Sequence, residues 1–249
     1  MSSTAETGSE LESVPLPGAR FGRDPARAIK RGPSRLPPEV VAATQRDRLY
    51  DGLVHTVAAK GYVNARVSDI CQAAGVTRPA FYALFDGKDD AFLATYRHGV
   101  DVLLQIMESA YRAAPDWRTG ARSALSVLLD VLAAVPAFAT MAVVEIDAVG
   151  PAARAERALL LRRFDQFFAE APRRADLRLP EELVGSVVGG IYSTIYRYVA
   201  ADRVDDLPDL LPVLSYFMLV PFLGREDAAR ELDRPEGHSE PAAPPCKPS

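Results

Sequence analysis

Side chains that could recognise DNA bases are concentrated in the stretch 67–88. The guanidinium of Arg78 can donate two hydrogen bonds to the O6 and N7 atoms of a guanine, which is the commonest specific contact in DNA recognition. The neighbouring Pro79, Ala80 and Ala83 can touch only apolar groups such as thymine methyls. These residue types therefore indicate a DNA-reading surface with few specific contacts.

Two short helices joined by a glycine turn would position this surface. Apolar residues recur at steps of three and four up to Ala74, and Gly75 can adopt the left-handed conformation that ends a helix. Thr77 can cap the next helix, while Val76 and Phe81 have the spacing of a hydrophobic staple that fixes its entry angle. The pattern predicts a helix-turn-helix.

The stretch 48–96 resembles the DNA-binding domain of the TetR family of bacterial transcriptional regulators. Order and spacing both match over about fifty residues, and the family usually has Thr or Ser in place of Arg66 and a polar residue in place of Leu84. The matching elements are Lys60-Gly61-Tyr62, Asp69-Ile70-Cys71, Gly75-Val76-Thr77, Phe81-Tyr82-Ala83-Leu84-Phe85 and Lys88.

The resemblance implies that Thr77, Tyr82 and Lys88 contact DNA phosphates, a task that suits a hydroxyl, a phenol and an ammonium. Phe81 and Phe85 lie on the opposite face of the helix and are expected in the core. The complete expected DNA-binding set is Arg66, Ser68, Thr77, Arg78, Pro79, Ala80, Tyr82, Ala83 and Lys88.

Charge is distributed unevenly along the 249 residues. Residues 19–88 contain 12 Lys and Arg against 6 Asp and Glu, while the rest of the chain carries a net charge of −10. A basic segment that coincides with the helix-turn-helix suits phosphate binding. The acidic remainder argues against a protein that coats nucleic acid with its whole surface.

Other classes of protein are disfavoured by composition. The chain has two cysteines, Cys71 and Cys246, so neither a disulfide framework nor a zinc site is available, and we expect no metal and no cofactor. Cys71 is interpreted as a small buried residue, with a redox sensor as the alternative. Catalytic motifs are missing, which argues against an enzyme. The longest uncharged runs contain proline and are too short for a membrane span, so we expect a cytoplasmic protein without a membrane partner.

The chain divides into four expected parts. Residues 1–38 are expected to be a disordered basic arm, 39–88 the DNA-binding domain, 89–231 a helical domain and 232–249 a disordered tail. The arm is either a solvated tail or a segment that follows the DNA beside the helix-turn-helix. Its positive charges are Arg20, Arg23, Arg27, Lys30, Arg31 and Arg35.

Apolar periodicity and proline punctuation predict an all-α fold, in which an N-terminal three-helix DNA-binding domain precedes a larger helical domain for ligand binding and dimerisation. Two long helices are expected on either side of the helix-turn-helix, at about 38–60 and 88–111. Further helices are expected at about 116–135, 137–148, 151–170, 181–201 and 207–223, with a short one after Gly224.

In the TetR family the C-terminal helices form a dimer interface and a ligand pocket. Small residues along 181–201 and the apolar character of 207–223 support a homodimer. Glu145, within an apolar run, is either paired with Arg162 or an anchor for a ligand. The expected ligand-binding residues are Trp117, Phe138, Met141, Glu145, Phe164, Phe168, Tyr192 and Tyr196.

The sequence is thus interpreted as a dimeric repressor that binds a palindromic double-stranded DNA operator and is released by a small, largely apolar effector. The alternative is a helical small-molecule sensor that acts through a protein partner without specific DNA binding.

Overall fold

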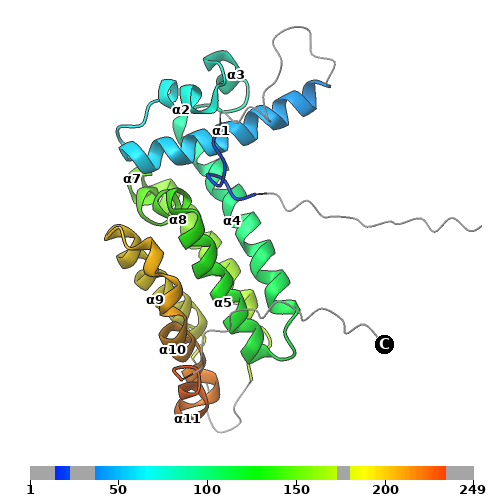
Figure 1. The fold of residues 1–249 in the computed structure, drawn as a ribbon, viewed down its shortest axis with the longest axis vertical. Helices are drawn as coiled ribbons and strands as arrows, with labels where there is room; N and C mark the ends of the chain where they lie inside the picture. Colours follow the sequence, from blue (N-terminus) through cyan, green and yellow to red (C-terminus); the bar gives the residue numbers. More distant parts are fainter. Residues whose placement is uncertain (1–14, 23–36, 173–179, 234–249) are drawn as a thin grey trace, which may run out of the picture.

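A computed structural model describes residues 15–22, 37–172 and 180–233, and within these ranges all regular elements are helices, which confirms the all-α class (Figure 1). In chain order the elements are α1 (Pro38–Lys60), α2 (Val67–Ala74), α3 (Arg78–Tyr82), α4 (Lys88–Arg112), α5 (Trp117–Ala134), α6 (Pro136–Ala139), η2 (Thr140–Glu145), α7 (Ile146–Val149), α8 (Pro151–Leu161), η3 (Arg162–Phe168), α9 (Leu183–Ala200), η4 (Val204–Asp206), η5 (Pro208–Leu210), α10 (Leu211–Leu223) and α11 (Arg225–Ala229).

Helices α1, α2 and α3 form one end of the elongated molecule, and α4 runs from them along its length into the larger helical domain (Figure 1). The core of this end contains Leu53 of α1, Ile70 of α2, Phe81 of α3 and Phe92 of α4, each at most 1% exposed. Burial of each such side chain contributes about 1.5–3 kcal/mol. Helix α4 therefore belongs to both domains and connects them.

Helix α1 also buries charged side chains, and their partners include residues expected to be disordered. The Arg48 guanidinium donates from Nε to the carbonyl of Gly22 at 2.8 Å. The Asp51 carboxylate accepts a hydrogen bond from the N–H of Gly18, also at 2.8 Å. Residues 15–22, the N-terminal strap, are consequently docked on α1, which corrects the expectation of disorder over all of 1–38. The rest of that arm lies outside the described residues, as do the tail residues from 234 on.

Two expected helices of the larger domain depart from α-geometry. The helix expected over 137–148 contains a π-helix, η2, between α6 and α7, and the one expected over 151–170 continues from α8 as the 3₁₀-helix η3. Within η2, the carbonyl of Val143 accepts a hydrogen bond from the Tyr192 hydroxyl at 2.9 Å. Tyr192 belongs to α9, so the π-helix is tied to α9 by this bond.

The far end of the domain is closed by a buried ionic cluster. Glu231 is 0% exposed, and its carboxylate lies 2.6 Å from Arg118 Nε and 3.0 Å from Arg122 Nε. Both arginines belong to α5. The cluster therefore fixes the chain that follows α11 to the centre of the domain.

Apolar composition is highest near the C-terminal helices. The stretch 204–223 is long and apolar enough to cross a membrane by length and composition alone, but 44% of it is buried within the fold. The exposed side chains of this stretch include Val213 and Phe217 of α10.

In the DNA-binding end, Cys71 is buried, and this burial raises the pKa of its thiol.

Candidate DNA-binding surface and effector cavity

The turn between α2 and α3 has the geometry that the sequence predicts. Gly75 ends α2 in the left-handed conformation with φ of 61°. The Thr77 hydroxyl oxygen accepts a hydrogen bond from the N–H of Ala80 at 3.4 Å and so caps α3. Val76 and Phe81 are both buried on the inner side of the turn. The outer face of α3 is thereby held in a fixed orientation.

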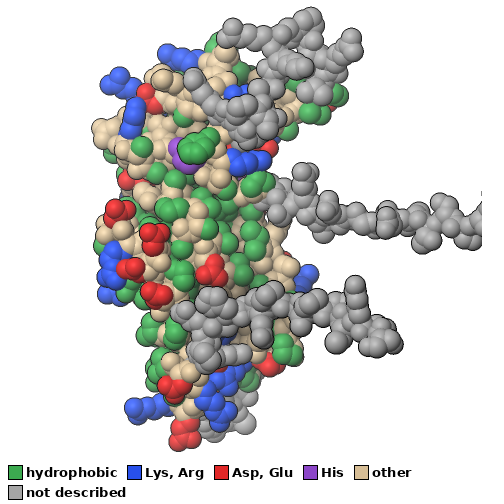
Figure 2. Space-filling model, viewed as in Figure 1, with side chains coloured by type: hydrophobic (Ala, Val, Ile, Leu, Met, Phe, Trp, Pro, Cys, Tyr) green, Lys and Arg blue, Asp and Glu red, His purple; other side chains and the backbone are tan. Residues whose placement is uncertain are grey.

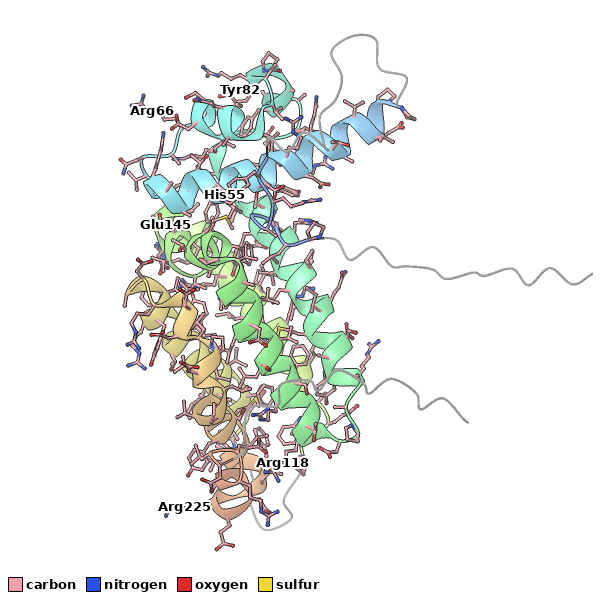
Figure 3. All side chains as sticks on the ribbon, viewed as in Figure 1. His55, Arg66, Tyr82, Arg118, Glu145 and Arg225 are labelled. Carbon is pink, nitrogen blue, oxygen red and sulfur yellow. The ribbon has the colours of Figure 1, made fainter. Side chains whose placement is uncertain are left out.

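The expected DNA-binding residues lie together at the end of the molecule that carries α2 and α3. Figure 3 shows Arg66 and Tyr82 on its outer side, and the Tyr82 side chain is 50% exposed. Several Lys and Arg side chains lie on this end in the space-filling view (Figure 2). Exposed members are Arg66, Ser68, Thr77, Arg78, Pro79, Tyr82 and Ala83, while Ala80 and Lys88 are half-buried.

Lys88 is engaged inside the protein. Its Nζ donates to the carbonyl of Tyr62 at 2.8 Å and to that of Ala65 at 3.0 Å, and it lies 4.0 Å from the centre of the Tyr62 ring. An ammonium has three donors, so one remains for a DNA phosphate. The phosphate contact stays a prediction, and the structure adds a second role at the start of α4.

Tyr62 forms hydrogen bonds with residues of both domains. Its N–H donates to Glu145 Oε2 at 2.6 Å, and its hydroxyl donates to the carboxylate of Asp89 at the start of α4. Its ring packs edge-on against Phe92. Burial, reinforced by the bond to Asp89, raises the pKa of the Tyr62 hydroxyl above its usual range, so the hydroxyl remains a donor.

Glu145 thus contacts the DNA-binding end rather than Arg162, the partner that the sequence suggested. Figure 3 shows it beneath α1, and its carboxylate lies beside Gly61 as well as Tyr62. It is also absent from the lining of the cavity described next. Position within an apolar run indicated a special role for this carboxylate but could not identify its partner.

The larger domain contains an apolar cavity of about 100 Å³ lined by side chains of α4, α5, α6, η2, α8, η3, α9 and α10. Four predicted residues line it: Phe138, Phe164, Phe168 and Tyr192. Residues that the prediction omitted include Tyr96, Val100, Leu103, Met107, Ala142, Val188 and Met218. Their helical spacing is that of ordinary core residues, so the sequence carried no signal that separates cavity lining from core.

Three further predicted residues lie away from the cavity lining. The Trp117 indole N–H donates to the carbonyl of Phe167 at 2.8 Å and its ring packs against Phe222. Met141 is fully buried in the core, and Tyr196 is half-buried on α9. These side chains therefore stabilise the packing around the cavity.

The polar groups of the cavity are neutral hydroxyls. The Tyr192 hydroxyl donates to Val143 and accepts from Arg157 Nη1 at 3.2 Å. Arg157 in turn forms an ion pair with Asp147 at 2.7 Å. Burial raises the pKa of Tyr96 and of Tyr192, so both side chains are uncharged. Such a lining suits an alkyl chain.

The cavity wall is mechanically joined to α4 and to the domain junction. A methyl group placed on Gly99 of α4 would lie 2.2 Å from the Phe138 ring, so this ring rests directly on the α4 backbone. Ala142 and Val143 of η2 line the cavity, and Glu145 at the end of η2 binds Tyr62. One π-helix therefore forms part of both the cavity and the junction.

An apolar face of α9 and α10 lacks a covering element among the described residues. Val213 and Phe217 on α10 are 50% and 42% exposed. A methyl group placed on Gly189 would meet no atom within 4 Å, whereas on Gly190 it would lie 2.8 Å from the Phe217 ring. Gly190 hence serves packing within the chain, and Gly189 faces open space.

The described residues contain no group of three or more His, Cys, Asp and Glu side chains that could hold a metal ion.

Comparison with known proteins agrees with this geometry. Residues 49–95 match the family described as bacterial regulatory proteins, tetR family. The HTH-type transcriptional activator FasR of Mycolicibacterium smegmatis is 30% identical over 113 residues, which is 45% of this chain and 49% of the relative, so the match spans about half the length of that curated protein.

Two solved structures share the fold over most of the chain. The fatty acid degradation regulator FadR from Bacillus halodurans aligns with a TM-score of 0.64 at 21% identity, over 77% of this chain and 97% of its own. FadR from Bacillus subtilis, solved in complex with stearoyl-CoA, aligns with a TM-score of 0.62 at 20% identity, over 71% and 97%. The segment 49–95 is therefore a DNA-binding domain of the TetR family of bacterial transcriptional regulators, and the chain as a whole has the fold of the FadR structures.

Proposed function

We propose that two copies of this chain bind a palindromic DNA operator and regulate transcription in response to a largely apolar effector. The observation that carries the proposal is the capped, exposed reading helix at one end of a molecule whose other end encloses an apolar cavity. Each protomer would place residues 78–84 in a major groove. Arg78, the one charged residue of α3, would supply the base-specific hydrogen bonds.

The effector class that fits is a molecule with a long alkyl chain, such as a fatty acyl thioester. The apolar lining and the two neutral tyrosines support this class, as does the stearoyl-CoA bound to the similar FadR of B. subtilis. The present cavity, about 100 Å³, is smaller than the engineered cavity of about 150 Å³ that takes benzene. A long chain must therefore spread the surrounding helices.

Spreading of the helices would reach the DNA-binding end by two contacts. Phe138 rests on Gly99 of α4, and the π-helix that carries Ala142 also carries Glu145, which binds Tyr62. Because the junction contacts are complete without a ligand, we assign the DNA-binding shape to the structure described. A ligand that favours another shape must lower operator affinity, so the chain would act as a repressor.

The experiment selects bound sequences from a random DNA pool and then measures operator affinity with stearoyl-CoA or acetyl-CoA. Stearoyl-CoA should weaken binding by about 5- to 150-fold, the usual range of allosteric coupling, and acetyl-CoA, which lacks the long chain, should not. Ala142→Trp fills the cavity and should abolish the response while operator binding persists. Ala158→Trp, at an exposed position of α8, is the matched control.

Three results would contradict parts of this proposal. A pool without enriched sequences would remove specific DNA binding and favour a sensor that acts through a protein partner. Tighter operator binding with stearoyl-CoA would reverse the sign of regulation. An unchanged response in Ala142→Trp would move the ligand out of the cavity.

The dimer is tested by two adjacent glycines of α9. Gly189→Leu meets open space within its own chain, so it should leave the fold intact and prevent close approach of a partner helix. Gly190→Leu collides with Phe217 and should instead lower the stability of each chain. Light scattering and thermal unfolding separate these effects. A stable Gly189→Leu dimer would place the interface elsewhere.

A further inference from the structure

The first half of the N-terminal strap (Pro15–Gly22) lies beside both domains. Leu16 is 5% exposed. A methyl group placed on Gly18 would lie 2.5 Å from Val54 Cγ1 and 3.6 Å from Val135 Cγ1. Val54 belongs to α1, whereas Val135 joins α5 to α6, the helix whose Phe138 lines the cavity. Gly18 has φ of 86°, a conformation that favours glycine.

The middle of the strap follows one side of α1. The Gly18 N–H donates to Asp51 Oδ1, and His55 Nε2 lies 3.0 Å from the carbonyl oxygen of Arg20. The Phe21 ring stacks on the His55 ring with centroids 5.1 Å apart. Figure 3 shows His55 on the part of α1 where the strap passes.

The strap ends at the turn of the helix-turn-helix. A methyl group placed on Gly22 would lie 2.8 Å from Ala74 Cα and 2.9 Å from the Ala73 carbonyl oxygen, at the end of α2. The Arg48 guanidinium bonds the carbonyl of Gly22 from Nε at 2.8 Å and that of Gly75 from Nη2 at 3.2 Å. One side chain thus ties the strap to the glycine that turns the chain into α3.

Helix α1 has a sequence suited to this strap. Arg48 and Asp51 are 9% and 2% exposed, and charged side chains are almost never buried without partners. Backbone groups of the strap supply part of that partnership. The strap has no helix of its own, so its attachment depends on these few contacts, and segments of this kind open at low free energy.

We propose that the N-terminal strap is a releasable brace that holds the helix-turn-helix to the cavity-bearing domain. Gly18 lies beside Val135, the residue that precedes α6, and Gly22 packs against the end of α2, so a shift of α6 on ligand entry would strain the strap or release it. The regulatory half of this inference rests on the proposed function, whereas the bracing half does not.

Two variants test the strap without altering a described helix: one detaches its end and the other removes it. Gly22→Ala introduces a methyl group against backbone atoms of α2, which cannot move aside cheaply, so the end of the strap should detach. Deletion of residues 1–22 removes the strap and keeps the basic residues from Arg23 on. Ala19→Ser, at an exposed position of the strap, is the matched control.

Hydrogen exchange of the free protein tests the brace. In the full chain and in Ala19→Ser, strap amides should be protected, including the Gly18 N–H. In Gly22→Ala and the deletion, amides of 67–82 should exchange at least about threefold faster, while those of α9 should not change. If the deletion leaves exchange in 67–82 unchanged, the strap is not a brace. This result needs neither DNA nor ligand.

The regulatory half is tested on the selected operator with stearoyl-CoA as the probe. The ratio of operator Kd values with and without the probe should fall at least about threefold in Gly22→Ala, while the affinity of the free protein for the probe stays constant. A full-chain ratio of one would count against the proposed function and leave the exchange result to decide on the brace. A normal ratio in the deletion would show that regulation bypasses the strap.

Discussion

Around α1, buried charged side chains are held by backbone groups, whereas around the cavity the packing is apolar and two helices depart from α-geometry. Arg48 and Asp51 each bond the strap, and Lys88, at the start of α4, donates to two carbonyls of the chain between α1 and α2. Directional bonds of this kind specify one arrangement. Apolar contacts and a void tolerate several, so the two ends differ in how readily they change shape.

The difference fits a division of labour between a rigid DNA reader and a deformable sensor. Changes in the polar contacts should therefore alter placement and coupling, and changes in the sensor should alter stability first.

Glu231→Ala should produce the largest loss. Removal of a fully buried carboxylate leaves Arg118 and Arg122 without its charge, and breaking a buried ion pair from one side costs about 3–5 kcal/mol. Chemical denaturation measures the effect, with the exposed neighbour Asp233→Ala as the control. A loss below about 1 kcal/mol would mean that the far end of the sensor is not locked by this cluster.

Arg78→Ala should weaken binding to the best operator by about 1–3 kcal/mol and relax preference at one position of each half-site. Fluorescence anisotropy on the selected operator and on single-base variants measures both. Equal weakening on every sequence would make Arg78 a phosphate contact and leave the reader without its main base contact.

Glu145→Ala should reduce the coupling between ligand and operator by about 1 kcal/mol, because the bond from the Tyr62 N–H is one of the connections between the domains. Glu145→Gln keeps an acceptor oxygen and should retain part of the coupling. The ratio of operator Kd values with and without stearoyl-CoA is the measurement. Full coupling in the alanine variant would exclude this route.

Asp165→Asn should have the smallest effect and the opposite sign. Burial raises the pKa of Asp165, with Arg162 opposing, and Oδ1 is buried without a hydrogen-bond partner within the described part of the chain. The raised pKa means that its contribution is favourable below the unfolded value, near 3.8, and is lost as pH rises through the folded value.

Accordingly, Asp165→Asn should stabilise the protein at neutral pH by less than about 1 kcal/mol, and the gain should vanish as pH falls below about 4. Thermal unfolding between pH 3 and pH 7 tests this. A gain that persists at low pH would indicate a packing effect instead of removal of a buried charge.

The DNA-binding end was predictable because local chemistry decides it. Gly75 and Thr77 mark a turn by their own conformational preferences, and the helix expected over 38–60 has those bounds in the structure. Around the cavity, aromatic content was predictable but orientation was not. Phe138 lines the void and Trp117 does not, because that choice depends on how eight elements pack together.

The strap escaped prediction for a related reason. Eight residues without periodicity give no local signal, and their order depends on partners in α1 that are distant along the chain. A signal was nevertheless present, since the charged residues Arg48 and Asp51 occur close to the buried Leu49 and Leu53 of α1. Charges at such positions indicate that something polar must cover them.

The hydrogen-bond pattern of the π-helix η2 determines the form that a ligand response can take. A π-helix bonds residue i to i+5 and an α-helix bonds i to i+4, and no stable backbone ladder lies between them. If ligand entry converts Thr140–Glu145 from one ladder to the other, the residues at its end rotate by about 100°, the turn of one residue. The junction would then switch between two discrete registers, and partial filling of the cavity would alter the fraction of molecules switched rather than the extent of movement in each.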